Sequence, residues 1–287
     1  MNGKTPTVLV IGAGGTIGGA VAADLRSRGW TVITTARKSG ADLRLDLTAP
    51  SHDWPVLPRA DVALVAAAVA IMSECRRDPE TSARVNVVGT TELASRLVKQ
   101  GTRVVYLSTN QVFDGLTAHR TADSAPCPRN EYGRQKAAGE TAIRAMGGTV
   151  LRLSKVLEAN SGIIPGWAET LMAGRAIQPF RDFNLAPVTL NHAVEACRTI
   201  LADPQDGIFQ LSGDADLPYS EMARRLACAL AADPALVQPA SFRDKGLLEE
   251  EFPPFSTMDV SGLTHRYGIT QPRSEDVMDA TIARVHP

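Results

Sequence analysis

The feature that most constrains the fold is a glycine-rich segment that joins a first strand to a first helix. The apolar run Thr7–Gly12 predicts a strand, and Thr16–Arg28 carries apolar side chains at helical spacing. Between them, positions 12–18 read Gly-Ala-Gly-Gly-Thr-Ile-Gly. Glycine at the first, fourth and seventh of these positions permits a tight turn, close backbone approach to a diphosphate and close helix–strand packing. The segment therefore predicts a dinucleotide-binding unit with phosphates at the helix N-terminus.

Short β-rich runs alternate with longer helical patterns over the first two thirds of the chain, which is typical of βαβ units. Further strands are expected at Thr31–Thr35, Leu43–Leu47, Val62–Ala66, Arg103–Ser108 and Thr149–Leu153. Long helices are expected at Pro79–Gln100 and Glu131–Met146, each followed by glycine. The chain is therefore expected to adopt an α/β fold, a Rossmann-type doubly wound parallel sheet.

The pattern loosens beyond residue 153, which indicates a smaller, mainly helical C-terminal region for substrate binding. Three later segments are expected to return to the main sheet: the strand Val188–Leu190, the helix Ala193–Leu201 and the strand Ile208–Ser212. We therefore assign residues 1–153 and 185–212 to the dinucleotide-binding domain. Residues 154–184 and 213–287 form the expected substrate-binding region.

Composition excludes several classes of protein. The formal net charge is −1, and no Lys/Arg-rich run is present, so a nucleic-acid partner is not expected. The apolar fraction of 44% is enough to build a core. The longest apolar run, Val62–Met72, is shorter than the roughly 18–20 residues that a bilayer span requires, and no signal-like apolar segment precedes the first strand. We expect a cytoplasmic protein without a membrane partner.

No metal site is expected from the cysteines and histidines. The four cysteines form no CxxC pair, and no two of the five histidines stand four residues apart. The cysteines are Cys75, Cys127, Cys197 and Cys228. In a chain of this size they are expected to be reduced and mostly buried.

The end of the second strand indicates which dinucleotide is bound. Sites selective for NAD usually place a carboxylate there to hold the ribose 2′-hydroxyl. This chain has Arg37 and Lys38 instead, and an arginine can hold a 2′-phosphate through two hydrogen bonds. We therefore expect NADP(H), although a solvated basic turn is the alternative. Asp46, after the third strand, either accepts a bond from the adenine amino group or caps a turn.

Tyr132 and Lys136 stand four residues apart within an expected helix, so they share one face. An ammonium beside a phenol is expected to lower the phenol's pKa from about 10 toward neutral pH, making it a usable proton donor. Ser108 and Thr109 end the preceding strand, and ligands bind at the carboxyl ends of strands in an open α/β sheet. The pattern favours an acid–base site at this edge.

Together these motifs resemble the extended short-chain dehydrogenase/reductase superfamily. The residues that carry the resemblance are the glycine pattern, Leu-Ser-Thr-Asn-Gln-Val-Phe-Asp-Gly at 107–115, Tyr132-Gly133-x-x-Lys136, and Gly139-Glu140. Within the superfamily, the chain is most similar to the dTDP-4-dehydrorhamnose reductase, or sugar-nucleotide-binding, branch. The resemblance implies that Thr109, Tyr132 and Lys136 form the catalytic triad.

A nicotinamide dinucleotide is the cofactor that the resemblance implies. The residues expected to contact it are Gly12, Gly14, Gly15, Thr16, Ile17, Gly18, Arg37, Lys38, Asp46, Leu47, Ala66, Ala67, Ala68, Asn86, Tyr132 and Lys136. Cations that could meet a substrate diphosphate are Arg152, Lys155, Arg175 and Arg181, with ordinary surface or ion-pair roles as the alternative for each.

The chain departs from the branch at two places that concern the substrate. Asn110 follows the catalytic threonine where the branch usually has Asp, and the loop at 182–187 keeps only the Asp and Pro of the usual Asp-Gln-x-Gly-x-Pro. Amides at Asn110 and Gln111 cannot perform acid–base work, which disfavours sugar dehydration.

The resulting expectation is an NADP(H)-dependent reductase of a keto group, with a 4-keto-6-deoxy nucleotide sugar as its substrate. Tyr132 is the expected proton donor. A nucleotide-sugar 4-epimerase is one alternative. Another is a non-catalytic NADP-binding subunit like the regulatory subunit of methionine adenosyltransferase. The sugar and the oligomeric state, a homodimer among the options, remain open at this point.

Overall fold

The computed structural model describes residues 5–38, 40–160 and 162–285, which form two compact units. In the described part, the first unit comprises residues 5–113, 125–152 and 191–210, and the second comprises the remaining segments. Residues 114–124, 153, 185–190 and 211–212, assigned to the dinucleotide-binding domain from the sequence, thus lie in the second unit. Residues 114–124 belong to the second unit because their backbone bonds to it: the Gly115 carbonyl accepts a hydrogen bond from the Phe255 amide at 3.0 Å.

A seven-stranded sheet forms the centre of the first unit, in the order β10-β6-β5-β4-β1-β2-β3. The strands are β1 (Val8–Ile11), β2 (Val32–Ala36), β3 (Leu43–Arg44), β4 (Val62–Val65), β5 (Arg103–Thr109), β6 (Thr149–Leu153) and β10 (Gly207–Leu211). The pairs from β3 through β2, β1 and β4 to β5 are parallel. This confirms the expected Rossmann-type α/β fold, in which parallel neighbours carry their loops at one edge.

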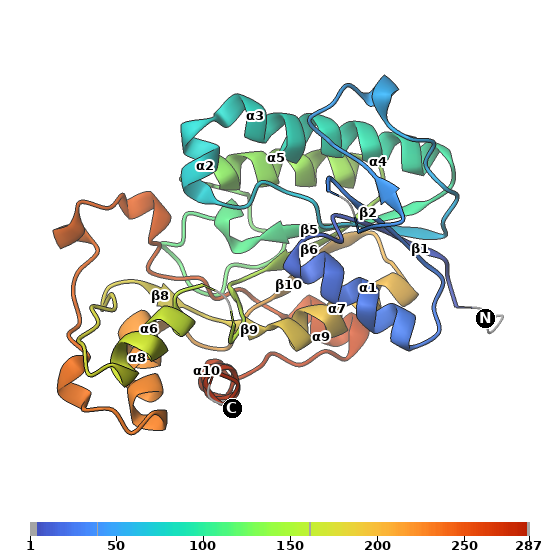
Figure 1. Cartoon of the computed structure of the whole chain (residues 1–287). Coiled ribbons are helices and arrows are strands. Elements are labelled where there is room, and N and C mark those ends of the chain that lie inside the picture. Colours follow the sequence, from blue (N-terminus) through green and yellow to red (C-terminus); the bar gives the residue numbers. More distant parts are fainter. Residues whose placement is uncertain (1–4, 39, 161, 286–287) are drawn as a thin grey trace. The chain divides into compact units, whose positions relative to one another are not determined.

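Helices cover both faces of this sheet (Figure 1). One face carries α2 (Met72–Arg77), α3 (Pro79–Ala83), α4 (Thr90–Lys99) and α5 (Glu131–Ala145), and the other carries α1 (Thr16–Ser27) and α7 (Leu190–Ala202). The long helix expected at Pro79–Gln100 is interrupted by a π-helical stretch, Arg84–Gly89, between α3 and α4. At Gly89, a Cβ would lie 2.6 Å from the Leu47 carbonyl oxygen, so glycine permits this close packing.

Two expected strands differ from the structure. The third strand ends at Arg44 rather than Leu47, because Asp46 already accepts the Thr48 amide in a turn. The segment expected at Val188–Leu190 does not join the main sheet. Its first two residues form β9 (Val188–Thr189), which pairs with β7 (Val156–Leu157) in a separate two-stranded sheet, and Leu190 starts α7.

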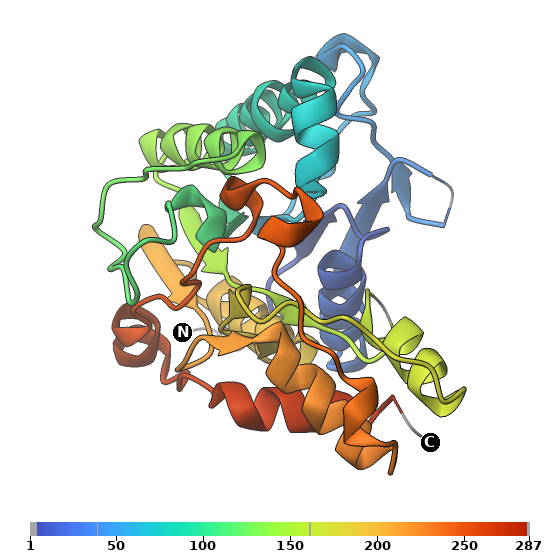
Figure 2. The same ribbon diagram turned by 90° about the vertical axis from the view of Figure 1, so that its left-hand side faces the viewer.

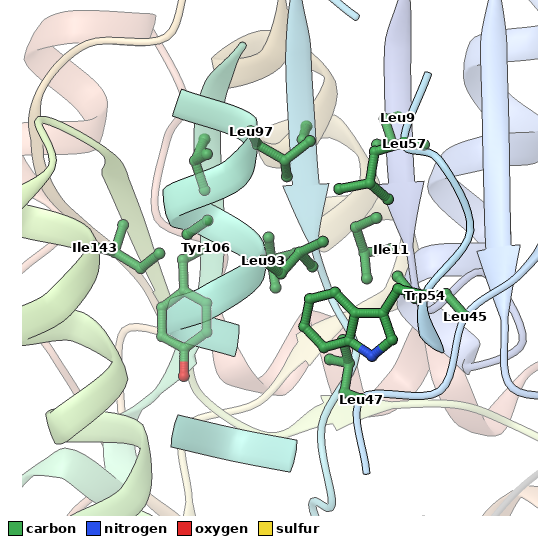
Figure 3. Close-up of a cluster of buried hydrophobic side chains, with 14 of the residues drawn as sticks. Leu9, Ile11, Leu45, Leu47, Trp54, Leu57, Leu93, Leu97, Tyr106 and Ile143 are labelled. Atoms are coloured by element: carbon green, nitrogen blue, oxygen red, sulfur yellow. The ribbon is translucent and has the colours of Figure 1, made fainter. Parts of the chain in front are cut away.

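The core of the first unit lies between the sheet and the helices α4 and α5 (Figure 3). Leu93 and Leu97, four residues apart on α4, are fully buried against Ile11, Tyr106 and the rim residue Trp54. The strands are apolar on both faces, as expected for parallel strands with helices on each side. Complete burial of a Leu side chain contributes about 1.5–3 kcal/mol.

The second unit has its own core, formed by α6 (Ile164–Met172), α8 (Tyr219–Ala229) and α10 (Ser274–Ile282). Figure 2 shows α8 and α10 side by side, and Met222 and Met278 are both fully buried between elements of this unit. A second two-stranded sheet pairs β8 (Asn184–Leu185) with β11 (Leu217–Pro218). The short helix α9 (Ser261–Tyr267) completes the helical elements of this unit in the described segments.

Among the residues that the structure describes, no helix combines the length and the apolar character that crossing a bilayer requires.

Gly139 and Tyr106 set the distance between α5 and β5. A Cβ on Gly139 would clash with the Tyr106 hydroxyl, and that hydroxyl is buried without a hydrogen-bond partner in the described part of the chain. We expect Gly139→Ala to destabilise the protein by about 1–3 kcal/mol, as overpacking does. Tyr106→Phe, which removes the unpaired hydroxyl, should be neutral or stabilising by about 1 kcal/mol.

Chemical denaturation of both single variants and of the double variant measures these effects. Tyr106→Phe should relieve part of the Gly139→Ala penalty, giving a non-additive cycle. Strictly additive changes in the free energy of unfolding would show that Gly139 and Tyr106 do not set the distance between α5 and β5.

Candidate active site

The glycine loop after β1 is shaped by contacts that exclude side chains. Gly12 has φ +90°, and a Cβ there would lie 2.6 Å from the Ala67 backbone nitrogen. A Cβ on Gly18 would lie 2.5 Å from the Gly12 carbonyl oxygen. At Gly15 the nearest such contact is 3.5 Å, so the protein itself leaves room there. The loop is thus a backbone-lined cradle of the kind that fits a dinucleotide diphosphate.

The helix that follows this loop presents an uncapped N-terminus. Gly15 is the N-cap of α1, makes no side-chain capping hydrogen bond, and is followed by a first turn without an acidic residue. Gly14, Gly15 and Thr16 are exposed, whereas Ile17 is partly buried and Gly18 is buried. Backbone N–H groups of a first turn carry partial positive charge, so the arrangement favours an anion such as a phosphate.

Arg37 and Lys38 follow β2 directly and are exposed. A Cβ on Gly14 would lie 3.4 Å from the Ala36 Cβ, so the glycine loop and the end of β2 are neighbours. The two cations therefore stand beside the loop, where the 2′ position of an adenosine ribose is expected.

Asp46 and Leu47 are engaged within the protein. The Asp46 carboxylate accepts the Thr48 amide at 3.0 Å and the Thr48 hydroxyl at 2.7 Å. These bonds, the hydroxyl bond foremost, lower the pKa of Asp46. Asp46 thus caps a turn, and its contact with an adenine amino group stays a prediction. The Leu47 side chain is buried in the core, which leaves its backbone for any cofactor contact.

Asn86 holds the loop after β4. Its Oδ1 accepts the Val69 amide at 2.8 Å, and its Nδ2 donates to the Val69 carbonyl at 2.9 Å and to Gln135 Oε1 at 2.8 Å. The preceding residues Ala66, Ala67 and Ala68 are partly buried. Asn86 therefore shapes the loop that carries these alanines, and its own contact with a cofactor stays a prediction.

The structure brings together Thr109, Tyr132 and Lys136 at the end of β5. Thr109 is the last residue of β5, and its hydroxyl accepts the Gln111 amide at 3.2 Å. Tyr132 and Lys136 lie on α5, whose N-terminus is capped by Asn130 through the Gly133 amide at 2.8 Å. The three side chains thus occupy the strand edge where the sequence placed them.

Lys136 is buried, with 3% of its surface exposed. Its Nζ donates to the Leu107 carbonyl at 2.6 Å and lies 3.8 Å from the centre of the Tyr106 ring. Burial lowers the pKa of Lys136 to about 7, and the nearby Glu140 carboxylate opposes this change. The amine is therefore close to its midpoint of protonation at neutral pH.

The phenol of Tyr132 behaves differently from the expectation. Lys136 was expected to lower its pKa, but burial raises the pKa of Tyr132 above its ordinary value, and Cys75 adds to the rise. A hydrogen bond with the Thr109 side chain opposes it. The physical reason is that desolvation disfavours the phenolate more than neighbouring groups stabilise it. Tyr132 is thus a protonated phenol at neutral pH.

For Arg152, the sequence left open a substrate diphosphate or an ion pair as its partner, and the structure shows the ion pair. Arg152 is 1% exposed and makes two hydrogen bonds to the buried Glu140, from Nε at 2.9 Å and from Nη2 at 2.7 Å. Ser108 Oγ donates to the same carboxylate at 2.5 Å. The motif Gly139-Glu140 drew attention to the carboxylate in the sequence, but no sequence pattern identified Arg152 as the residue that pairs with Glu140.

The other three cations lie in the second unit and are exposed. Arg181 donates to the Pro239 carbonyl at 3.4 Å, and Lys155 lines a pocket. Arg175 follows the end of α6. Asp182, retained from the branch pattern, holds the chain through the Ser241 hydroxyl and the Phe242 amide, the latter at 3.0 Å.

The pocket in the second unit has a volume of about 280 Å³ and largely apolar walls. Its aromatic residues are Trp167, Phe180, Phe183, Tyr219 and Phe252. Phe183 and Tyr219 stack with ring centres 4.6 Å apart, and Phe252 meets Phe183 edge-on at 5.0 Å. Sequence reasoning missed this pocket because its residues come from separate segments without a shared periodicity.

A metal centre finds no support in the described residues, where no group of three or more His, Cys, Asp or Glu side chains is arranged to hold an ion.

Comparison with known proteins gives one family match and several relatives. The family model described as RmlD substrate binding domain matches residues 6–286. A probable low-salt glycan biosynthesis reductase of Haloferax volcanii is 27% identical, over 94% of this chain and 95% of that protein. Methionine adenosyltransferase 2 subunit beta of Rattus norvegicus is 25% identical, over 89% of this chain and 81% of that protein.

A solved structure shares the fold. The dTDP-4-dehydrorhamnose reductase of Bacillus anthracis in complex with NADP superposes with a TM-score of 0.81 at 18% identity. The match covers 99% of this chain and 100% of that one.

The lowered pKa of Lys136 makes stability depend on pH. Between about pH 7 and its ordinary pKa of 10.5, the unfolded chain holds a proton that the folded protein releases. The free energy of unfolding should therefore rise with pH in this window, by at most about 1.4 kcal/mol per pH unit, relative to Lys136→Met. Below pH 7 both states are protonated, and the difference should level off.

Denaturation of the wild type and Lys136→Met at several pH values measures this slope. Lys99→Met, at the exposed end of α4, is the control and should stay parallel to the wild type. A wild-type curve parallel to that of Lys136→Met would contradict the assignment.

Proposed function

Because the chain belongs to the family of the RmlD substrate binding domain, we propose that it is an NADP(H)-dependent reductase of a keto group. The proposed substrate class is a 4-keto-6-deoxy nucleotide sugar, as for dTDP-4-dehydrorhamnose reductase. The observation that carries the proposal is the assembly of Thr109, Tyr132 and Lys136 at the carboxyl end of β5. In an open α/β sheet this edge is the ligand-binding edge.

Each of these residues has a role that its environment supports. Tyr132 keeps its proton at neutral pH because burial raises its pKa, so it is the group that donates a proton to the substrate carbonyl oxygen. The Thr109 hydroxyl, already hydrogen-bonded with Tyr132, orients the same oxygen. In its protonated form, Lys136 holds the nicotinamide ribose. When bound, a reduced nicotinamide dinucleotide supplies the hydride for the carbonyl carbon.

Binding of this cofactor is supported by the backbone cradle of the glycine loop. The cofactor diphosphate would lie against the N-terminus of α1. The tight packing at Gly12 and Gly18 shapes the loop, and at Gly15 the protein leaves open space for the phosphates. The preference for the 2′-phosphate rests on Arg37 and Lys38, because exposed cations stand where an NAD site usually has a carboxylate.

Substrate binding is proposed for the second unit, with its pocket of about 280 Å³. The rings of Phe180, Tyr219 and Trp167 line this pocket, and aromatic walls of this kind suit a nucleobase. Lys155, exposed at the same pocket, is the cation available for a phosphate. Similarity to a probable low-salt glycan biosynthesis reductase supports a sugar substrate.

A non-catalytic regulatory subunit is the second candidate, favoured by the 25% identity with methionine adenosyltransferase 2 subunit beta. Such a subunit would bind NADPH without turnover and would hold an enzyme partner through an interface of roughly 1,200 Å² or more. The Tyr132–Thr109 hydrogen bond argues for the reductase, because a binding subunit gains nothing from an oriented proton donor.

The proposal predicts that the protein oxidises NADPH in the presence of a 4-keto-6-deoxy sugar nucleotide. Tyr132→Phe should lower turnover by about 10²–10⁴-fold and leave NADPH affinity within a few-fold of wild type, because only the proton donor is removed. The absorbance of reduced nicotinamide and a fluorescence titration measure the two quantities. Retained activity in Tyr132→Phe would disprove the assigned role.

The same assay separates the alternatives. A 4-epimerase would keep its cofactor bound and convert the sugar without net NADPH oxidation. Absence of turnover over a panel of 4-keto sugar nucleotides, together with a stable enzyme partner, would favour the regulatory subunit.

Cofactor preference provides an independent prediction. NADPH should bind more tightly than NADH, and Arg37→Ala should weaken NADPH binding by about 1.5–3 kcal/mol while leaving NADH unchanged. Arg28→Ala is the matched control, because Arg28 is an exposed cation already paired with Asp24 at 3.0 Å. Titration of both cofactors into the three proteins tests this, and equal affinities in the wild type would refute it.

A further inference from the structure

One face of α5 contacts three consecutive residues at the end of β5. Tyr132, Lys136 and Glu140 follow one another at intervals of four residues. Tyr132 bonds with the Thr109 side chain, Lys136 donates to the Leu107 carbonyl, and Glu140 accepts from Ser108. Glu140 therefore lies on the same face of α5 as Tyr132 and Lys136, the two proposed site residues of this helix.

The Glu140 carboxylate is buried and held from several sides. It is 3% exposed and receives Arg152 Nε, Arg152 Nη2 and Ser108 Oγ. Arg152 is fixed in turn by Gln210 Oε1 at 3.1 Å and by the Phe113 ring, 4.8 Å from its guanidinium. A buried ion pair is weak evidence for stability, since desolvation of the two charges offsets their attraction.

The Lys136 ammonium lies among groups that are mostly neutral. Its hydrogen bond goes to a carbonyl, and its nearest ring is Tyr106 on β5. The titratable groups beside it are Tyr132 and Glu140, one helical turn before and after it on α5, and Tyr106 on β5. Arg152 on β6 pairs with Glu140, and Cys75 on α2 acts on Tyr132. Glu140 is the carboxylate in this set.

We propose that Glu140 is a positioning residue that keeps the Lys136 amine charged and directed at the end of β5, and that Arg152 fixes Glu140 in that place. The benefit for turnover rests on the proposed function, whereas the effect on Lys136 does not. Burial alone pushes the amine toward its neutral form, and the carboxylate one helical turn away opposes this. A neutral amine would lose its charge-assisted grip on a cofactor ribose.

Direct titration of Lys136 tests the proposal without any assay of activity. The chain contains six lysines, so ε-¹³C-lysine labelling gives few signals, and the signal lost in Lys136→Met identifies Lys136. Glu140→Gln preserves the size of the side chain and removes its charge. The midpoint of Lys136 should fall by about one pH unit or more, the usual effect of one adjacent charge.

A matched control removes a carboxylate elsewhere on the same unit. Glu92 on α4 also accepts from an arginine, Arg96 Nε at 3.0 Å, but at an exposed position. Glu92→Gln should leave the Lys136 midpoint unchanged. A fall of equal size in this variant would overturn the proposal, because the effect would then not depend on the buried carboxylate.

Two further variants keep the test valid if Glu140→Gln does not fold. Glu140→Asp retains the charge and should titrate closer to the wild type than Glu140→Gln. The double variant Glu140→Gln/Arg152→Gln leaves no unpaired buried guanidinium. Its midpoint should lie below the wild type but fall less than in Glu140→Gln, because loss of the Arg152 cation acts in the opposite direction. A Lys136 midpoint at the wild-type pH in the folded charge-removing variants would overturn the proposal.

Measurements of NADPH binding and oxidation separate a failure of this proposal from a failure of the proposed function. With an active wild type, NADPH affinity should fall as the pH rises through the Lys136 midpoint, and this alkaline limb should move to lower pH in Glu140→Gln together with that midpoint. A wild type that neither binds nor oxidises NADPH would refute the proposed function, while the Lys136 titration would still decide the role of Glu140.

Discussion

The close contact between α5 and β5 is the interaction on which the rest of the first unit depends. It exists because α5 carries glycine at its two close approaches, at Gly139 against Tyr106 on β5 and at Gly133 against Gln111 in the turn that follows the strand. Absence of these side chains lets the polar face of α5 reach Thr109, Leu107 and Ser108 directly. The same approach buries the reactive groups, and burial then controls their chemistry.

Burial shifts both proposed site residues toward their neutral forms. It raises the pKa of Tyr132 and lowers that of Lys136. For the phenol this is useful, because a proton donor must hold its proton until the substrate arrives. For the amine it is a cost, because a neutral lysine binds a ribose less well. The buried Glu140 opposes this effect, so the site can hold a protonated phenol beside an amine that is close to its midpoint of protonation at neutral pH.

The two units differ in what holds them together. The first relies on fully buried strands and on glycine contacts, and its site consists of backbone and a few buried polar groups. The second is small and helical, and its pocket is built from aromatic rings such as Phe183, Tyr219 and Phe252. Phe183, which lines this pocket, lies in the segment 182–187, where the sequence departs from the pattern of the resembling branch.

The sequence by itself determined the Rossmann-type sheet, the glycine cradle and the grouping of Thr109, Tyr132 and Lys136. These features depend on local periodicity and on spacing within one strand–helix unit, which a single chain displays directly. Only the tertiary structure decided that Arg152 forms a buried ion pair with Glu140, that the Asp46 carboxylate caps the turn at Thr48, and that β9 lies outside the main sheet. It also reversed the expected pKa shift of Tyr132, because desolvation depends on which elements pack around a group, and strand order rather than local sequence sets that packing.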